Sequence, residues 1–506
     1  MVTSHLIGIS LVSAAFLVFA RGIVRRSKGK KFQPLPVFVL LLVALVYQLA
    51  RPAGGFTERM GHLFLDFGLG MVIASTYLAM ARERAKMFWV PGALGIIAGG
   101  VVYLFSFIVQ TVACDLSEKP ETIELLVELG EDDHIEEIQP ILKKYCARAE
   151  RAFPNVDESE DKDLSKYYLV YVDSAKRHPL SLELKNDREN VDQFDINHPV
   201  SLIEPIASEA QRKDPPTKYM ANDPFLNDQW FAEKLQYNEA YKILHANAPK
   251  KKVKVAIVDT GVDKDHEDLS GIYKKSGGEG DYDLHSHGTH CAGLAGAATN
   301  NGKGVGSLNW AGDFITISGY PALDDQGRGT DQRVAKAIID AAEGGADVIS
   351  MSLGGFSPFG PPKAQVDAIK YARKLGAIVV VAAGNSNDDA RKYSPANISG
   401  VITVAAVDPS LNKASFSNRN TKLKMPIAAP GVNILSSVPE SKYMSYNGTS
   451  MATPIVAGLL GIMKAYQPDL TTEEAYKILK STGTKVKDSD KVGKVINPVS
   501  VIQQVK

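Results

Sequence analysis

The sequence has no excess of charge of either sign, because 57 lysines and arginines balance 57 aspartates and glutamates over 506 residues. This balance provides no overall positive field to attract nucleic acid, so we expect no nucleic-acid partner. Cysteine is scarce as well. Three cysteines, Cys114, Cys146 and Cys291, are too few for a disulfide framework, which excludes a small disulfide-stapled scaffold. The length indicates two or three folded units.

Long apolar runs are confined to the N-terminal part of the chain. Four stretches approach the roughly 20 residues that cross a bilayer as a helix, and they lie at residues 6–24, 35–50, 62–81 and 88–113. A cleaved signal peptide is the alternative for the first stretch, but the positive charges follow this stretch and further apolar stretches come after it. The sequence therefore predicts an all-α transmembrane region over residues 1–114, with the lipid bilayer as a partner.

The charges between these stretches predict their orientation. Nine lysines and arginines follow the first and third stretches, whereas two lie between the second and the third. By the positive-inside rule the two basic segments lie in the cytoplasm, and the N-terminus and everything after Cys114 lie on the extracytoplasmic side. Asp66 in the third stretch is either a functional ionisable group or a hydrated residue near the outer interface, and we favour the second interpretation.

Residues 115–205 have the pattern of a small α+β segment. A strand is predicted over 122–130, an amphipathic helix over 132–153 and a second strand over 166–173, followed by a short helix within 180–194 and a closing strand over 199–205. None of these residues has catalytic spacing. The polar, proline-containing segment 206–224 is typical of a linker and of a target for proteolysis.

From residue 225 to residue 506, short apolar runs alternate with helical stretches. The runs are continuous and β-branched, which is typical of strands covered by helices on both faces. They lie at residues 253–259, 314–320, 346–354, 377–385 and 401–408, with helices predicted at 331–343 and 364–375. The pattern predicts a doubly wound, mostly parallel α/β sheet, in which functional sites gather at the carboxyl ends of the strands.

Polar residues stand at several of these ends. Asp259 and Asn385 end two runs, Ser450 opens a long apolar helix, and His287 lies in the segment "HSHGTHCAG". Singly, the aspartate and the asparagine are typical of turns and the serine of a helix cap. Jointly, an acid, an imidazole, a hydroxyl and an amide donor are the four parts of nucleophilic acyl transfer.

The same histidine-rich segment has a second interpretation. Residues 284–293 hold three histidines and Cys291, and imidazole and thiolate are the usual zinc ligands. A metal-dependent hydrolase or metal-binding module built on this His-Cys cluster is therefore one alternative. If a helix begins at His287, Cys291 lies one turn on, beneath the imidazole, while His290 points elsewhere and His285 stays in a loop.

Five segments carry a resemblance to a known family. In chain order, "VDTGVDKDHEDL", "HSHGTHCAG", "SMSLGG", "AAGN" and "NGTSMATP" resemble the signature blocks of the subtilases, the subtilisin-like serine proteases. The resemblance covers roughly residues 223–466, and the cysteine in "HGTHCAG" resembles the proteinase K branch. It implies a subtilisin-like fold and an endopeptidase that hydrolyses peptide bonds in proteins through an Asp-His-Ser triad and an acyl-enzyme.

The resemblance also implies a role for each matched residue. Ser450 is the expected nucleophile and His287 its general base and later general acid, while Asp259 orients the imidazole. The amide of Asn385 and the backbone N–H of Ser450 form the expected oxyanion hole. Two segments are expected to pair with protein or peptide substrates in extended conformation, and they comprise Gly327, Arg328 and Gly329, and Ser352, Leu353 and Gly354.

Cofactor use follows from the same resemblance. Catalysis requires none, but structural calcium is common in the family, and Asp268 and Asn301 match its ligand positions. Two residues depart from the family pattern. Lys303 would oppose a cation, and Ile455 stands where histidine is common.

Secreted subtilases carry an inhibitory prodomain directly before the catalytic unit, and residues 115–205 occupy that place. The sequence thus predicts a transmembrane region (1–114), a prodomain-like segment (115–205), a processing region (206–224) and a peptidase domain (225–506). Cleavage within about 205–224 would release the peptidase from its anchor. The remaining alternative is a catalytically silent membrane sensor that binds peptides.

Overall fold

The computed structural model describes residues 122–202, 208–209, 218–276 and 279–506. Contacts divide the chain into two units, Met1–Pro120 and Glu121–Lys506, and the description concerns the second. The four apolar stretches predicted to span a membrane lie outside the described residues. Within the described ranges, no helix has both the length and the apolar character needed for a membrane crossing.

A six-stranded sheet with the order β15-β14-β12-β10-β7-β8 forms the centre of the larger part of this unit. All neighbouring strands in it are parallel. The five apolar runs of the sequence are confirmed as strands, whereas β15 was not predicted because its segment, "PIAAP", holds a single β-branched residue between two prolines. The strands are β7 (Val253–Asp259), β8 (Ile315–Pro321), β10 (Val348–Met351), β12 (Ile378–Ala382), β14 (Ile402–Val407) and β15 (Pro426–Pro430).

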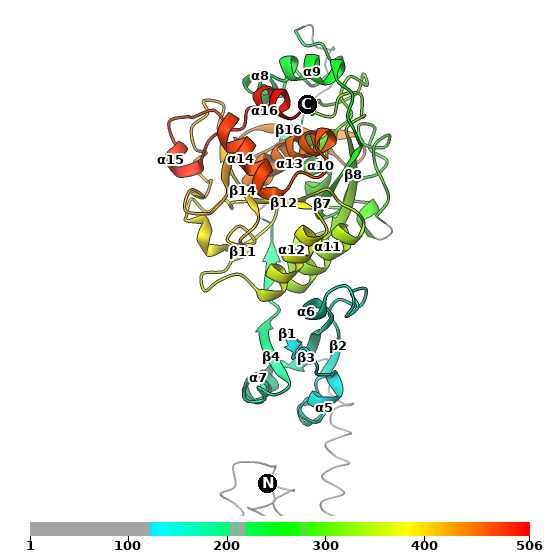
Figure 1. The fold of residues 1–506 in the computed structure, drawn as a ribbon, viewed down its shortest axis with the longest axis vertical. Coiled ribbons are helices and arrows are strands. Elements are labelled where there is room, and N and C mark those ends of the chain that lie inside the picture. Colours follow the sequence, from blue (N-terminus) through cyan, green and yellow to red (C-terminus); the bar gives the residue numbers. More distant parts are fainter. Residues whose placement is uncertain (1–121, 203–207, 210–217, 277–278) are drawn as a thin grey trace, which may run out of the picture. The chain divides into compact units, whose positions relative to one another are not determined.

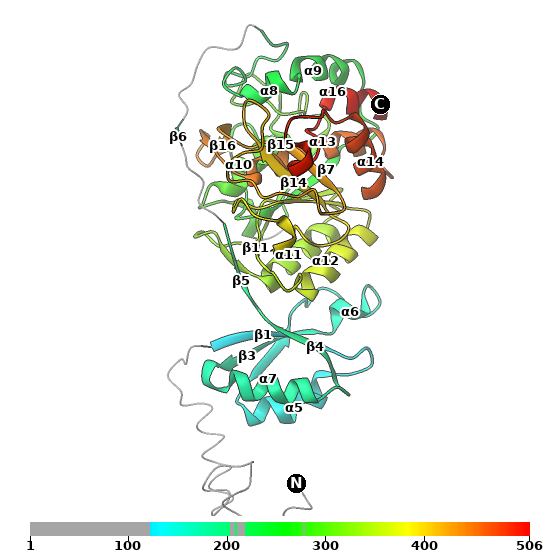
Figure 2. The same cartoon turned by 90° about the vertical axis from the view of Figure 1, so that its left-hand side faces the viewer.

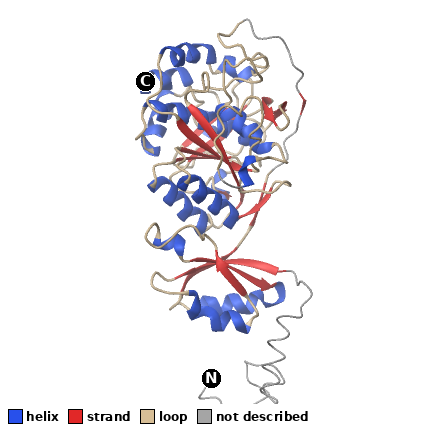
Figure 3. Cartoon of the chain, turned by 90° about the vertical axis from the view of Figure 1, so that its right-hand side faces the viewer, coloured by secondary structure: helices blue, strands red, loops and turns tan. Residues whose placement is uncertain are grey.

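Helices cover both faces of this sheet (Figures 1 and 3). On one side lie α11 (Asp331–Glu343) and α12 (Lys363–Lys374), and on the other lie α10 (His287–Gly296) and α13 (Thr449–Tyr466). Every residue of β10 and β12 is buried as a result. This two-sided burial explains why the sequence shows continuous apolar runs in place of alternation. The predicted doubly wound parallel sheet is therefore confirmed.

A second, antiparallel sheet lies in the segment before residue 197, with the order β2-β3-β1-β4. Its helices α5 (Ile135–Lys144) and α7 (Arg177–Asn186) lie on one face (Figure 2). Apolar residues such as Leu125, Ile138 and Leu180 form a core of its own between them. Its strands are β1 (Thr122–Leu129), β2 (Arg148–Arg151), β3 (Tyr167–Asp173) and β4 (Val191–Ile196).

The helix predicted over residues 132–153 is wrong in its second half. The helix α5 ends at Lys144, the chain turns at Cys146 with a positive φ of 56°, and residues 148–151 pair with β3 as an antiparallel strand. The open edge of β3 provides hydrogen-bonding partners for this segment, a tertiary constraint that no local pattern reports. Cys146 is disulfide-bonded, whereas Cys291 is a free, buried cysteine.

The predicted closing strand over 199–205 does not close the small sheet. Its described part, β5 (Pro199–Ser201), pairs antiparallel with β9 (Arg328–Thr330) of the larger part. Just before β5, the carbonyl of His198 accepts a hydrogen bond from Asp331 N (3.0 Å), and the side chain of Asn197 accepts one from Gln332 N (2.9 Å). Residues 197–198 thus satisfy backbone donors at the first turn of α11, which have no partner inside the helix.

The remaining elements surround the two sheets. The short strands are β6 (Ser208–Glu209), β11 (Gly355–Phe356), β13 (Tyr393–Ser394), β16 (Ile434–Val438) and β17 (Lys442–Tyr446). The remaining helices are α6 (Lys162–Ser165), α8 (Trp230–Lys234), α9 (Tyr237–Ala246), α14 (Thr472–Thr482), α15 (Ser489–Val492) and α16 (Pro498–Val505), with three short 3-10 turns at Ser174–Lys176, Glu279–Asp281 and Ala390–Lys392.

Candidate active site

The carboxyl edge of the parallel sheet brings the predicted catalytic residues together. Asp259 is the last residue of β7, and Asn385 follows β12 by three residues. His287 is the first residue of α10, and Ser450 is the second residue of α13. Because parallel strands end at a common edge, four residues spread over nearly 200 positions converge there.

Asp259 and His287 form a buried pair. The Oδ1 atom of Asp259 lies 2.7 Å from Nδ1 of His287, and the two side chains are 0% and 1% exposed. The same Oδ1 accepts a hydrogen bond from Thr260 N at 2.8 Å. Burial by itself opposes protonation of His287 and is the largest single effect, but the negative charge of Asp259, the hydrogen bond to it and the neighbouring Cys291 together raise the histidine pKa well above its ordinary value. The pair therefore presents a strengthened base with Nε2 directed away from the aspartate.

Ser450 lies in the first turn of α13 and stays partly accessible. Its hydroxyl donates a hydrogen bond to the carbonyl of Ser352 at 3.0 Å. Among the described residues, no hydrogen bond joins this hydroxyl to His287. A rotation about the serine χ1 bond therefore has to precede proton transfer to the imidazole, and such tightening on substrate binding is common at catalytic hydroxyls.

The side chain of Asn385 is held from one end. Its Oδ1 accepts hydrogen bonds from the backbone N–H of Thr449 (2.9 Å) and from the Thr449 hydroxyl (2.8 Å). A β-carbon on Gly448 would lie 3.3 Å from Asn385 Nδ2 and 3.5 Å from Ser450 N. The two N–H donors therefore flank the space that this glycine leaves open, which is the arrangement that stabilises an oxyanion.

The two predicted substrate segments border the same site. Within the β5–β9 ladder, Val200 pairs with Gly329 and Ser201 with Arg328, and beyond it Leu202 N donates to Gly327 O at 2.9 Å. A cavity of about 210 Å³ continues from there. Its lining includes Ser201 and Leu202 together with Ser352, Leu353, Gly354, Asn385 and Ser450. The chain's own strand thus lies on the edge predicted to pair with substrate.

The histidine-rich segment separates into unequal members. His285 stays in the loop before α10. The Nε2 atom of His290 lies 3.0 Å from the carbonyl oxygens of both Ile434 and Met444, so this histidine has a packing role. Cys291 lies one turn beyond His287, with Sγ 3.9 Å from His287 Nδ1, which confirms its predicted place beneath the imidazole.

A metal centre fits these residues poorly. In the described part of the chain, the group that comes near to metal-binding geometry is Asp259, His287 and Cys291, which already includes the buried hydrogen-bonded pair. Burial raises the pKa of the Cys291 thiol, whereas a metal ligand has to be a thiolate. The donor set therefore disfavours the metal-hydrolase alternative.

The two residues predicted as calcium ligands lie together. Asn301 Nδ2 donates a hydrogen bond to Oδ1 of Asp268 at 3.1 Å, while its Oδ1 accepts one from Lys303 N at 2.8 Å. Asp223, which the sequence did not single out, joins them by accepting hydrogen bonds from the backbone N–H groups of Asn300 (2.8 Å) and Asn301 (3.3 Å). Both carboxyls are buried. Burial raises the pKa of Asp223 to about 7 and that of Asp268 to about 6. Calcium binds oxygen ligands, and two buried carboxyl groups without a basic partner among the described residues would be stabilised by its positive charge.

Two residues of the site escaped the sequence analysis. Thr449 fixes the amide of Asn385, but nothing in the segment "NGTSMATP" indicates that its threonine contacts this asparagine. Asp223 precedes Pro224 at the end of a polar linker, and no spacing connects it with Asp268. Both act through contacts between segments far apart in the chain, so local pattern carries no signal for either.

Comparisons with known proteins identify relatives of this chain. Residues 250–494 match the model of the subtilase family. Thermitase from Thermoactinomyces vulgaris is 42% identical over 48% of this chain and 85% of its own length. A thermophilic serine proteinase from Bacillus sp. (strain AK1) is 31% identical over 71% of this chain and 86% of its own length. Among solved structures, the epidermin leader peptide processing serine protease of Staphylococcus aureus has a TM-score of 0.58 at 21% identity, covering 76% of this chain and 98% of that one, and this likeness shows the fold alone. These matches do not distinguish a proteinase K branch.

The raised pKa of His287 predicts the acid limit of activity. A general base has to be neutral, so kcat/KM for a chromogenic peptide should fall as the pH drops through the histidine pKa, with a midpoint above the ordinary value of 6.5. Asp259→Asn should reduce kcat by about 10⁴ and move this midpoint down. The pH profile of kcat/KM measures both effects, and a wild-type midpoint below 6.5 would contradict the electrostatic role of Asp259.

Cys291 predicts sensitivity to mercurials. A mercury atom on Sγ would occupy the space beneath the His287 imidazole, so peptide hydrolysis should be lost, slowly because the thiol is buried. Cys291→Val should keep activity and abolish the sensitivity. Residual activity is measured against time of exposure to p-chloromercuribenzoate for both proteins. Equal inhibition of the valine variant would show that another group is the target.

Proposed function

This chain belongs to the subtilase family and is a subtilisin-like serine endopeptidase, and we propose that Asp259, His287, Ser450 and Asn385 perform its hydrolysis of peptide bonds. The observation that carries this proposal is the buried hydrogen bond between Asp259 and His287 at the sheet edge where Ser450 and Asn385 also lie. An acid–base pair, a hydroxyl at a helix N-terminus and two N–H donors are what acyl transfer requires.

The proposed reaction has two stages. Ser450 Oγ attacks the carbonyl carbon of the scissile bond while His287 Nε2 takes the hydroxyl proton, and Asn385 Nδ2 and Ser450 N–H stabilise the negative oxygen. The imidazolium then gives its proton to the departing amine as the C–N bond breaks, leaving an ester on Ser450. Water attacks this ester with His287 again as the base, which releases the acid and restores the hydroxyl.

Substrates are proposed to bind as an added strand. The β5–β9 ladder supports this proposal, since the peptidase edge formed by Gly327 and Gly329 accepts an extended segment with backbone hydrogen bonds. On the side opposite β9, β5 lies next to β11. A β-carbon added to Gly355 of β11 would lie 3.9 Å from the carbonyl oxygen of Pro199 in β5. Polypeptide in extended conformation, from unfolded or looped regions of proteins, fits this edge.

Self-processing is proposed from the same ladder. Residues 122–202 precede the peptidase part, fold around their own core and lead their last described residues into the cavity that Ser450 lines. The match to the Bacillus sp. (strain AK1) proteinase covers 71% of this chain, more than residues 225–506 comprise, so the likeness extends into the upstream part. We propose that residues 115–205 act as a prodomain and that the first cut falls within about residues 205–224.

Membrane anchoring is proposed from the N-terminal sequence, with the peptidase part on the extracytoplasmic side. The apolar stretches and the asymmetry of lysine and arginine support this topology. Processing within about residues 205–224 would separate the peptidase from the anchor.

Replacing the proposed oxyanion donor tests the catalytic assignment. Asn385→Ala should lower kcat by about 10²–10³ with a small change in KM, which is the cost of losing such a donor in a subtilisin. Ser450→Ala should abolish turnover of a chromogenic peptide. Ser481→Ala is the matched control, because this serine is exposed on α14 and bonds to Ile478 O. Proteolysis that survives Ser450→Ala would refute the proposed nucleophile.

Expression of the full chain tests processing and anchoring together. Wild type should yield a soluble fragment that begins within about residues 205–224, whereas Ser450→Ala should remain full-length and in the membrane fraction after an alkaline carbonate wash. N-terminal sequencing and fractionation measure both. Equal processing of the Ser450→Ala protein would exclude self-cleavage, and its appearance in the soluble fraction would exclude the anchor.

Calcium binding by Asp223, Asp268 and Asn301 is proposed as a source of stability. A carboxyl whose pKa rises on folding holds more protons in the folded state, so without the cation stability falls as the pH rises from 3.8 to about 7 through the pKa of Asp223. Calcium takes the place of these protons. Chelation should therefore lower the Tm more at pH 8 than at pH 5. At a free calcium concentration of 100 times Kd, bound calcium adds about 2.7 kcal/mol to the free energy of unfolding, and chelation removes this contribution.

Two variants sharpen the calcium experiment, with scanning calorimetry as the measurement. Asp223→Asn should lose most of the chelator effect. Asp265→Asn should keep the chelator effect, because this aspartate is exposed and paired with Lys264, although it lies only three residues from Asp268. An equal chelator effect in wild type and Asp223→Asn would contradict the proposed site.

A further inference from the structure

The backbone that carries Asn385 is held by a second, fully buried asparagine. Asn418 is 0% exposed and follows β14 on a separate loop. Its Oδ1 accepts hydrogen bonds from Ser386 N (3.0 Å) and Asp388 N (2.8 Å), and its Nδ2 donates to Ala383 O (2.9 Å). Its own backbone N–H donates to Gly384 O at 2.9 Å. All four hydrogen bonds therefore end on residues that flank Asn385.

The contact between Asn418 and this backbone is close enough to determine a residue type. Gly384 has a φ of +98°, and a β-carbon there would lie 2.5 Å from Asn418 Nδ2. A larger side chain at this position would displace the amide, and the positive φ would be strained as well. Gly384 thus lets the Asn418 carboxamide lie against the main chain next to Asn385.

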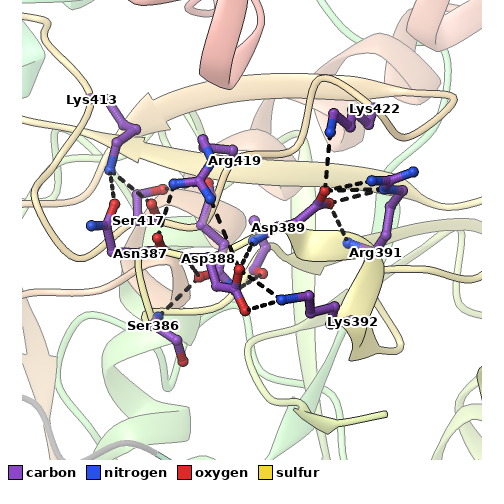
Figure 4. A network of polar contacts seen from close by, with 12 residues as sticks. Ser386, Asn387, Asp388, Asp389, Arg391, Lys392, Lys413, Ser417, Arg419 and Lys422 are labelled. Carbon is purple, nitrogen blue, oxygen red and sulfur yellow. Dashed lines mark hydrogen bonds and ion pairs between the residues drawn. The ribbon is translucent and has the colours of Figure 1, made fainter. Parts of the chain in front are cut away.

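The loops that carry the two asparagines are joined along their length (Figure 4). Main-chain hydrogen bonds connect Asn387 N to Phe416 O (2.7 Å), Arg419 N to Asp388 O (2.7 Å) and Ala390 N to Arg419 O (3.0 Å). Lys413 Nζ reaches Asn387 Oδ1 at 2.9 Å, as Figure 4 shows. These bonds hold the loops in register and keep the Asn418 amide opposite the Asn385 backbone.

The charged pairs on the outside of the loop that follows Asn385 contribute less to its stability than the buried hydrogen bonds of Asn418 do. Asp389 bonds to Arg391 at 2.7 Å and Asp388 to Lys392 at 3.0 Å, but the basic partners are about half exposed. Exposed ion pairs of this kind are worth little because water and salt screen them. Buried amide hydrogen bonds cost more to lose, since the partner groups stay desolvated. The buried side chain of Asn418 is therefore the main side-chain contact that holds the backbone of this loop in place.

We propose that Asn418 is a positioning residue for the oxyanion hole, acting on the reaction through Asn385. Thr449 fixes the carboxamide oxygen of Asn385, and Asn418 fixes the backbone on either side of this residue. Both attachments have to be in place for Nδ2 to meet the developing oxyanion. Geometric errors of about 1 Å at a reacting centre can cost about 10² in rate. This proposal rests on the oxyanion role proposed above for Asn385.

A double-mutant cycle tests the proposal with a matched control. Asn418→Ala should lower kcat for a chromogenic peptide by about 10- to 100-fold while KM changes by less than about threefold. In an Asn385→Ala background the same substitution should have almost no further effect on kcat, because the donor that it positions is gone. A peptide aldehyde, whose adduct uses the oxyanion hole, should bind the Asn418→Ala protein more weakly by a similar factor.

Asn420→Ala is the control. This asparagine is also 0% exposed and two residues away, but its Nδ2 donates to Thr403 O (2.8 Å) and Ile427 O (3.0 Å). It should lower the Tm without changing kcat per active site, with sites counted by a serine-directed sulfonyl fluoride. Should Asn418→Ala fail to fold, Asn418→Asp keeps both accepted hydrogen bonds and loses the donated one, and its smaller loss of kcat should again vanish in the Asn385→Ala background.

The outcomes separate the two proposals. Losses in kcat that are additive for Asn418 and Asn385, or equal losses in the Asn418 and Asn420 variants, would overturn the positioning role. A kcat unchanged by Asn385→Ala alone would overturn the oxyanion assignment, and the positioning role would fall with it.

Discussion

A buried carboxylate at the end of β7 is the constraint on which the active site depends. Asp259 is completely shielded from solvent, and the hydrogen bonds of its Oδ1 with Thr260 N and the His287 imidazole offset part of the cost of burying it. Its neighbour Thr260 extends the network, donating to Asp283 (2.9 Å) and accepting from Gly288 N (3.0 Å). Asp283 in turn binds Thr289. The end of β7 and the start of α10 are thereby fixed to each other, and the orientation of His287 follows.

The proposed oxyanion donors depend on a different set of contacts from those of Asp259 and His287, and both sets lie at the carboxyl edge of the sheet. Thr449 at the start of α13 fixes the Asn385 amide, while Asn418 contacts the backbone on either side of it. These contacts come from three loops that are distant in sequence and close only because β12 and β14 are neighbours in a parallel sheet. Rigid main-chain attachment in a water-poor setting is what lets an N–H donor stabilise charge without reorganising during the reaction.

The segment before the peptidase part uses the same edges as a substrate would. Its strand β5 pairs with β9, and residues 197–198 satisfy backbone donors of α11. The buried side chains of Glu128 and Asp367 share Lys363, which lies 2.5 Å from one carboxylate and 2.8 Å from the other. Apolar burial and these compensated charges hold this segment on the peptidase part, so β5 occupies the edge that is proposed to bind an incoming peptide. That shared edge links the proposed prodomain to the proposed mode of substrate binding.

The sequence by itself determined the elements whose cause is local. Continuous β-branched runs predicted five of the six sheet strands, because strands between two helical layers bury every residue. Motif order, together with the family resemblance, singled out Asp259, His287, Ser450 and Asn385. The tertiary structure alone decided that residues 148–151 form a strand, that β5 leaves its own sheet, and that Asp223, Thr449 and Asn418 lie against residues of the proposed functional sites. Those outcomes rest on hydrogen bonds between segments far apart in the chain, and a partner supplied by another segment leaves no periodicity in the sequence around it.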